Sequence, residues 1–283
     1  WQKILVKANK GILLNGLVLR KPTWIGFSDS CPLGLGGFTH GGRGWRLKVN
    51  PALASHGEDV ANNLLEFLGM AITLWLSLIE CREQNLIDEV ILILGDNTCA
   101  ISWIFKSGFN TISIYRNAVL FIARKIADLV IDSKNFVDSQ HLPGVLNLIS
   151  DWLSFEGTSR IENGKAKANP IAHDCPSNEV VTHRILSAFP QLVPAGFRVC
   201  QLPKEILSFA RQAILIFKLS LTQRQKLDQK ARTGFGEGGN HTATNTWVDQ
   251  TQALLEYPER KPSLHVAPSL NCTEDPISQS QEA

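Results

Sequence analysis

The chain has 283 residues, of which 28 are Lys or Arg and 26 are Asp or Glu, so its formal net charge is +2. This near balance excludes a global electrostatic field as the basis of nucleic-acid binding and leaves that role to local basic patches. The six cysteines are scattered and form no CxxC pair, which favours a reducing compartment over a disulfide framework. We therefore expect an intracellular protein, cytoplasmic or nuclear.

The longest apolar run lies between Glu66 and Glu80, and these charges interrupt it before it reaches the ~18 to 20 residues that a membrane span needs. We expect no membrane contact. The chain begins with Trp1 and contains one methionine, so we expect it to be a piece of a longer polypeptide, with residues 1–21 as a connector from an upstream domain.

After the connector, the segments TWIGFSD, GLGGFTHGG and RGWRLKV predict three strands joined by glycine-rich turns. From residue 62 to about 81 the pattern is helical and apolar on most sides, which is typical of a helix packed against a sheet. A short apolar run at 89–94 suits a central strand, and Asp96-Asn97-Thr98 is expected to cap a helix that continues to about residue 105.

Residues 115–130 predict an amphipathic helix, 135–142 a strand, and 147–154 a final helix after a Pro-Gly turn. The resulting order, β-β-β-α-β-α-α-β-α, predicts an α/β domain with a mixed sheet over residues 22–155.

The composition changes after residue 155, and we expect a mostly irregular C-terminal extension. Residues 156–179 predict a linker, and 180–232 a small basic segment that is partly helical. Seven Lys or Arg between 204 and 232 suit either non-specific nucleic-acid binding or a solvated helix, and we favour the helix. Residues 233–283 are too polar to pack a core and are expected to be a disordered tail.

Four carboxylates stand at unusual places along the domain: Asp29, Glu66, Asp96 and Asp151. Three of them interrupt or end apolar stretches, where an unpaired buried charge is costly. Each has a structural explanation by itself: Asp29 closes a strand, Asp96 caps a helix, and the other two lie on polar helix sides. These explanations do not predict an acid from each of four elements, so we favour a shared pair of divalent cations, for which Mg²⁺ is the natural choice.

The segments FSDSCPLGLGG, NNLLEFLG, ILGDNTCAISW and HLPGVLNLISDWLS resemble the four motifs of a ribonuclease H domain of the reverse-transcriptase type, as carried by retrotransposon polyproteins. The last segment is the most specific and is similar to elements of the DIRS-like, tyrosine-recombinase kind. The resemblance covers roughly residues 22–155 and implies a ribonuclease H-like fold, a mixed five-stranded sheet with flanking helices. Phe155 stands where the family usually has Arg.

The resemblance implies that Asp29, Glu66, Asp96 and Asp151 bind two Mg²⁺ (or Mn²⁺) ions, which activate the attacking water and stabilise the leaving 3′ oxygen. His141 lies where related enzymes carry a mobile histidine for proton transfer or product release, and a simple turn role for His141 stays open. The implied activity is endonucleolytic hydrolysis of the RNA strand of an RNA–DNA hybrid. The implied partners are the hybrid and an upstream reverse transcriptase domain of the same polyprotein.

Two alternatives stay open. The first is a ribonuclease H-fold connection or scaffold domain that binds nucleic acid without turnover, against which the retention of all four acids argues. The second is a DDE-type transposase or integrase core, whose acids run Asp, Asp, Glu, whereas Glu66 comes second here. The chain contains neither a YxDD polymerase motif nor an Arg/His/Tyr recombinase constellation.

Overall fold

In the part of the chain that the structure describes, the main sheet contains six strands, of which the first three form an antiparallel meander and the next two add in parallel. The computed structural model describes residues 6, 20–31, 34–49, 58–106, 116–154, 158–162, 165–168 and 177–232. The strands of the sheet are β1 (Trp24–Cys31), β2 (Gly34–Thr39), β3 (Arg43–Lys48), β4 (Val90–Gly95), β5 (Phe136–His141) and β8 (Arg198–Val199).

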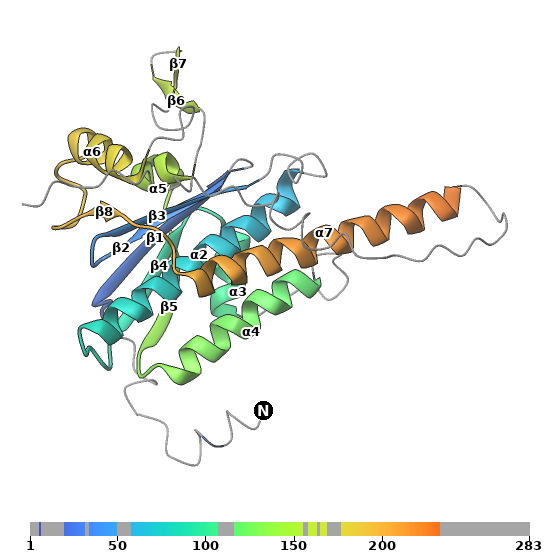
Figure 1. Ribbon diagram of the computed structural model, residues 1–283, viewed down its shortest axis with the longest axis horizontal. Helices are drawn as coiled ribbons and strands as arrows, with labels where there is room; N and C mark the ends of the chain where they lie inside the picture. Colours follow the sequence, from blue (N-terminus) through green and yellow to red (C-terminus); the bar gives the residue numbers. More distant parts are fainter. Residues whose placement is uncertain are drawn as a thin grey trace, which may run out of the picture.

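The spatial order of the strands is β5-β4-β1-β2-β3-β8 (Figure 1). The expected α/β class with a mixed sheet is therefore confirmed, but the expected count of five strands is one too low. The additional strand, β8, joins β3 in parallel through two residues only, and so short a segment carries no alternation that would predict a strand.

Helices cover both faces of the sheet (Figure 1). They are α2 (Glu58–Glu83), α3 (Thr98–Lys106), α4 (Arg116–Asp132), the 3₁₀ turn η3 (Gly144–Leu146), α5 (Leu148–Leu153), α6 (Asn178–Ala188) and α7 (Lys204–Arg232). Strands β6 (Thr158–Glu162) and β7 (Lys165–Ala168) form a separate hairpin within the expected linker. The expected disordered tail and nearly all of the expected connector lie outside the described residues.

Helix α2 is the central element of the larger core and lies directly on the sheet. Trp45 of β3 donates its indole N–H to the Thr73 hydroxyl of α2 at 3.1 Å. Gly37 permits this close approach, because a Cβ there would lie 2.8 Å from Thr73 Oγ1. Residues 62–83 of α2 are long and apolar enough to cross a membrane, but most of this stretch is buried inside the protein, as in a core helix.

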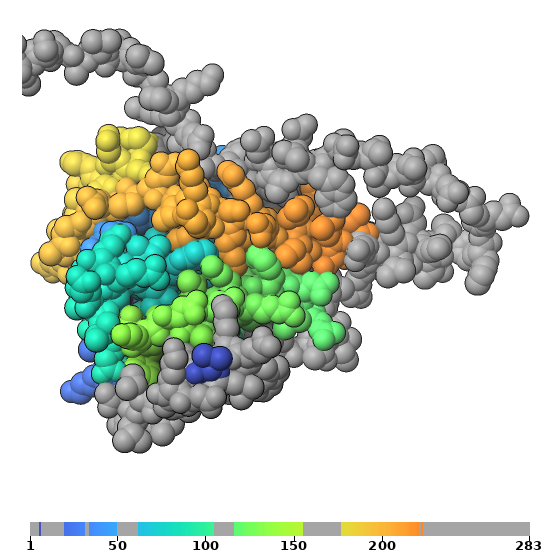
Figure 2. Space-filling view, turned by 60° about the horizontal axis from the view of Figure 1, so that its bottom comes forward, coloured from blue at the N-terminus to red at the C-terminus, as the bar shows by residue number. Residues whose placement is uncertain are grey.

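Helix α7 belongs to the same core, which extends beyond the expected domain boundary at residue 155. The apolar side chains that α7 buries recur at helical spacing: Ile206, Leu207, Phe209, Ala210, Ala213, Ile214 and Phe217. The ring of Phe209 packs against Trp75 of α2 at 5.7 Å and against Phe121 of α4 at 5.4 Å between centroids. Figures 1 and 2 both show α7 lying along α2 and α4.

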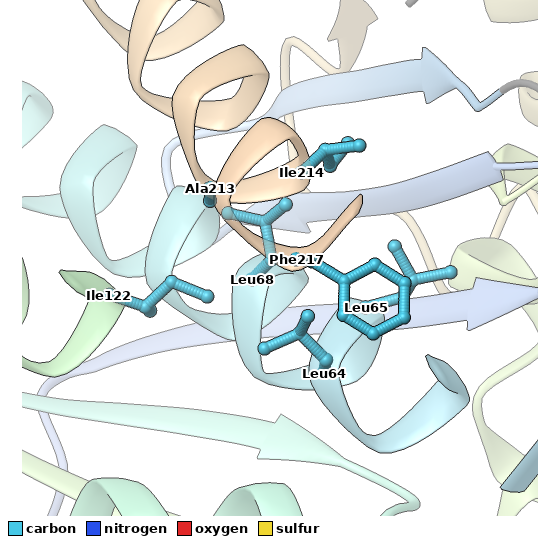
Figure 3. A pocket seen from close by; sticks show the side chains of 7 residues that line it. All are labelled: Leu64, Leu65, Leu68, Ile122, Ala213, Ile214 and Phe217. Atoms are coloured by element: carbon cyan, nitrogen blue, oxygen red, sulfur yellow. The ribbon is translucent and has the colours of Figure 1, made fainter. Parts of the chain in front are cut away.

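The sequence-based expectation of a solvated helix is thus wrong for the first half of α7. The Lys and Arg residues of α7 led to that expectation. They lie between apolar residues of the same helix, and these apolar residues pack against α2 and α4. The described part of the C-terminal extension is mostly helical and not irregular. Figure 3 shows a pocket where the three helices meet, and its lining is entirely apolar: Leu64, Leu65, Leu68, Ile122, Ala213, Ile214 and Phe217.

A second, smaller core covers the opposite face of the sheet. It joins the meander to α5, α6 and β8, and consists of Phe38, Ile149, Leu153, Val181, Ile185, Phe197 and Val199. Gly36 of β2 allows α5 to approach, because a Cβ there would lie 2.3 Å from the Leu153 carbonyl carbon. The position of α5 on the sheet therefore depends on that glycine.

Candidate metal centre

Three of the four predicted carboxylates converge at one edge of the sheet. One carboxylate oxygen from each of Asp29, Glu66 and Asp96 lies within 4.8 Å of the other two. The strand register explains the pair of aspartates: β1 and β4 run parallel, and the last paired residues are Phe27 and Leu94, so Asp29 and Asp96 each follow two positions later. Parallel neighbouring strands have their carboxyl ends on the same side of the sheet, and Glu66 of α2 lies beside the two aspartates there.

Glu66 is the most deeply buried member of the group, with 2% of its surface exposed. Its Oε1 accepts hydrogen bonds from the Ser30 N–H at 2.9 Å and from the Ser30 hydroxyl at 2.8 Å. Among the residues that the structure describes, its Oε2 is buried and has no hydrogen-bond partner. Burial raises the pKa of Glu66 well above its usual value, the charges of Asp29 and Asp96 raise it further, and the Ser30 bonds act in the opposite direction.

The two aspartates lie in different surroundings. Asp29 is 5% exposed, and its Oδ2 accepts a hydrogen bond from the Ser154 hydroxyl at 2.8 Å. Burial raises the pKa of Asp96, while its own backbone N–H and the nearby His141 lower it. Three carboxylates at this separation repel one another, so a bound cation is the simplest way for all of them to be ionised together.

The helix cap that follows β4 is made by Asn97. Its Oδ1 accepts the Ala100 N–H at 3.0 Å, as an N-cap side chain does, and its Nδ2 donates to Asn63 Oδ1 of α2 at 2.7 Å. The cap predicted for Asp96-Asn97-Thr98 is therefore present, and Asn97 accounts for it. The Asp96 carboxylate lies with those of Asp29 and Glu66.

Asp151 is not among the three carboxylates that share the 4.8 Å group. It lies in the first turn of α5, and the Ser154 hydroxyl, 2.8 Å from Asp29, is 3.0 Å from the Asp151 carbonyl oxygen. The structure thus brings together three of the four predicted ligands and places the fourth on α5, whose C-cap residue Ser154 hydrogen-bonds to Asp29.

His141 ends β5 and pairs in register with Gly95, the residue before Asp96. It is exposed, and its electrostatic effect is one of the causes that lower the pKa of Asp96. The following loop also approaches Asp96, because a Cβ on Gly144 would lie 3.0 Å from Asp96 Oδ2.

Sequence reasoning missed the residues that orient the acids, namely Ser30 and Ser154. Both stand inside the motifs that carry the acids, Ser30 directly after Asp29 and Ser154 at the end of SDWLS, and that position was the available signal. Their hydroxyls hold one oxygen of Glu66 and one of Asp29.

The donor set fits a hard divalent cation. All three groups offer carboxylate oxygens, without a thiolate or imidazole within the described group, and such ligands suit Mg²⁺ or Mn²⁺ better than Zn²⁺. The buried Glu66 Oε2 is an independent indication, because an unpartnered oxygen at this depth is costly unless a cation or donor binds it.

No protein-family model matches the chain, and comparisons with curated proteins and with solved structures find no match either.

Proposed function

We propose that this chain is a metal-dependent ribonuclease of the ribonuclease H type, which cleaves the RNA strand of RNA–DNA hybrids as part of a retroelement polyprotein. The observation that carries the proposal is the convergence of Asp29, Glu66 and Asp96 within 4.8 Å, with a buried Glu66 oxygen that has no described partner. The mixed sheet and its flanking helices are compatible with a ribonuclease H-like fold, with β8 as an addition.

Asp29, Glu66 and Asp96 would hold two Mg²⁺ (or Mn²⁺) ions, with Asp151 of α5 as the remaining ligand. When bound, such a pair supplies an activated water and stabilises the leaving 3′ oxygen. The Ser30 and Ser154 hydroxyls keep the carboxylates of Glu66 and Asp29 oriented. His141, exposed at the end of β5, would aid proton transfer or product release.

The substrate follows from the same chemistry. A hybrid presents ribose 2′-hydroxyls of one strand in a wide, shallow minor groove, which small polar side chains can read. Asn63 and Asn97, hydrogen-bonded to each other beside the acids, offer such groups. The upstream reverse transcriptase domain of the polyprotein would deliver the hybrid, inside the cell and away from membranes.

The second candidate function is that of a scaffold domain that binds nucleic acid without cleaving it, and the position of Asp151 favours this candidate. Asp151 lies outside the group of three carboxylates, so a chain that binds nucleic acid without turnover is compatible with this arrangement. Cleavage itself decides between the two candidates.

The test is hydrolysis of an end-labelled RNA–DNA hybrid by the full chain in Mg²⁺ or Mn²⁺, beside the variant Asp96→Asn. A matched control is Asp132→Asn, which makes the same change at the exposed C-terminal end of α4. We expect cleavage by the wild type and by the control, and none by Asp96→Asn or in the presence of a chelator. Hybrid binding without cleavage by both wild type and Asp96→Asn, with either metal, would instead support the scaffold function.

A further inference from the structure

Two consecutive apolar side chains, Val145 and Leu146, are left in solvent beside the acidic group. Val145 is 65% exposed and Leu146 is 64% exposed. They are the most exposed large apolar residues in the part of the chain that the structure describes. A single exposed apolar residue is ordinary, but an adjacent pair in an ordered turn is not.

The turn that carries this pair is fixed to the strands that carry the acids. At its start, the Leu142 N–H donates to the Gly95 carbonyl at 2.8 Å, directly before Asp96. At its end, the Asn147 side-chain amide donates to the Ser28 carbonyl at 2.9 Å, directly before Asp29.

Inside the turn, the Leu146 N–H donates to Pro143 at 2.7 Å and the Asn147 N–H donates to Gly144 at 3.0 Å. The exposure of Val145 and Leu146 is therefore built into a hydrogen-bonded turn. It is not the by-product of a loose loop.

The turn also lies against the acidic group. A Cβ on Gly144 would meet Asp96 Oδ2 at 3.0 Å, and Val145 and Leu146 are the next two residues. A phosphate held through metal ions at the acids, as the proposed function requires, would have a flanking nucleoside near this turn. The turn carries no charged side chain between Leu142 and Asn147, so the contact it offers is apolar.

We propose that Val145 and Leu146 form an apolar contact with the nucleoside next to the phosphate held at the acids. Apolar side chains, Leu and Ile among them, contact base steps in minor-groove complexes of other proteins. This inference rests on the proposed nuclease function and deepens it, because it assigns a substrate-positioning surface to residues that take no part in metal binding. A second copy of the chain is a poor occupant, since two side chains bury far less than the ~800 Å² per partner of a stable interface.

The test is the double variant Val145→Ser/Leu146→Ser, measured for hybrid cleavage and, with Asp96→Asn added, for hybrid binding by fluorescence anisotropy. The matched control is Ile87→Ser. Ile87 is similarly exposed, at 62%, but it precedes the amino end of β4, whereas Asp96 follows the carboxyl end of that strand. We expect about tenfold weaker binding by the double variant, as the loss of two half-buried apolar contacts implies. The loss should appear in KM and not in kcat, and Ile87→Ser should bind as the parent does.

The salt dependence separates this contact from a phosphate contact. Loss of a phosphate contact lowers the slope of log affinity against log salt, whereas loss of an apolar contact leaves that slope unchanged. We expect an unchanged slope, and we expect Leu146→Phe, which keeps an apolar side chain, to retain the affinity of the parent. Circular dichroism of each variant verifies that the turn substitutions leave the fold intact.

The outcomes separate the two proposals. If the wild type cleaves the hybrid and the double variant keeps its KM and affinity, the apolar contact is overturned while the nuclease function stands. A reduced salt slope, or a changed oligomeric state in place of changed affinity, overturns the contact as well. If the wild type neither binds nor cleaves the hybrid, both proposals fall together.

Discussion

Ser30 donates two hydrogen bonds to the same oxygen of Glu66, one from its backbone N–H at 2.9 Å and one from its hydroxyl at 2.8 Å. Both bonds go to Oε1, so Oε2 is the oxygen left without a described partner. The residue that follows Asp29 in the sequence thereby sets the orientation of a second acid from a different element. Ser30 couples β1 to α2 at the candidate metal centre.

Ser30→Ala is expected to weaken metal binding without abolishing it. Groups that orient metal ligands typically contribute 10- to 100-fold to metal affinity, and one of the two Ser30 bonds remains in this variant, so we expect about a tenfold loss. The measurement is the Mn²⁺ dependence of unfolding and of hybrid cleavage. Ser133→Ala, which removes a hydroxyl at the end of α4, is the control; an equal effect of both substitutions contradicts the assignment.

Metal binding itself is expected to stabilise the chain. A cation that binds only the folded state raises stability by RT ln(1 + [L]/Kd), about 2.7 kcal/mol at 100 times Kd. Millimolar Mn²⁺ should therefore raise the midpoint of thermal unfolding, and Glu66→Gln should remove most of that increase. A chelator should reverse it in the wild type. An equal response of wild type and Glu66→Gln to Mn²⁺ would place the ion elsewhere.

Glu80, at the far end of α2, predicts a pH dependence of stability that is independent of the acidic group. Burial raises its pKa above the usual 4.5 and the charge of Glu83 adds to this, while the Thr39 hydroxyl, Arg43 and the Gly41 backbone N–H lower it. Arg43 Nε lies 3.3 Å from Glu80 Oε1. The folded state therefore holds the Glu80 proton more tightly than the unfolded state does.

The sign follows from linkage. The stabilising contribution is present below pH ~4.5 and is lost as the pH rises through the folded-state pKa. Glu80→Gln should lose less stability than the wild type between pH 4.5 and 7.5, measured by urea unfolding in the absence of divalent metal. Asp132→Asn, at the exposed C-terminal end of α4, is the control and should follow the wild-type curve. A wild-type slope in Glu80→Gln contradicts the assignment.

Gly36→Ala tests whether the position of α5 matters for activity. A Cβ at Gly36 would lie 2.3 Å from the Leu153 backbone carbon and 2.4 Å from the Ser154 nitrogen, so α5 must shift. We expect a loss of about 1 to 3 kcal/mol in unfolding free energy, as for overpacked cores, and a larger loss of cleavage because α5 carries Asp151 and ends at its C-cap Ser154.

Gly69→Ala is the matched control for that change. A Cβ at Gly69 would lie 3.7 Å from Leu35 Cδ2 and from Ser28 Cβ, which is ordinary contact, and alanine is favoured over glycine inside a helix by about 1 kcal/mol. Gly69→Ala should therefore be neutral or stabilising and should retain cleavage. Full cleavage by Gly36→Ala would show that α5 contributes nothing to the site.

Phe209→Ala tests the assignment of α7 to the main core. Phe209 is 6% exposed and packs between Trp75 and Phe121, so its truncation should cost about 3 to 5 kcal/mol in unfolding free energy. Ser208→Ala, at the exposed neighbouring position, should change stability by less than about 0.5 kcal/mol. A cost below about 1 kcal/mol for Phe209→Ala, seen in urea unfolding, would mean that α7 is dispensable.

The elements up to residue 154 were largely predictable, because their patterns are local. Alternation and glycine-rich turns indicated β1 to β3, and the apolar run of residues 62–81 indicated the buried helix α2. The unusual positions of Asp29, Glu66 and Asp96 were visible for the same reason. An acid that interrupts an apolar segment needs no tertiary information to be noticed.

What the sequence alone determined is therefore the order of elements and the identity of the candidate acids. Only the tertiary structure decided that the parallel register of β1 and β4 brings Asp29 level with Asp96, and that Asp151 stands on the adjoining helix. It also decided that α7 is a core helix, because the partners of its apolar side lie on α2 and α4, far away along the chain. Local periodicity reports which side of an element is apolar, but strand pairing and helix packing decide what that side meets.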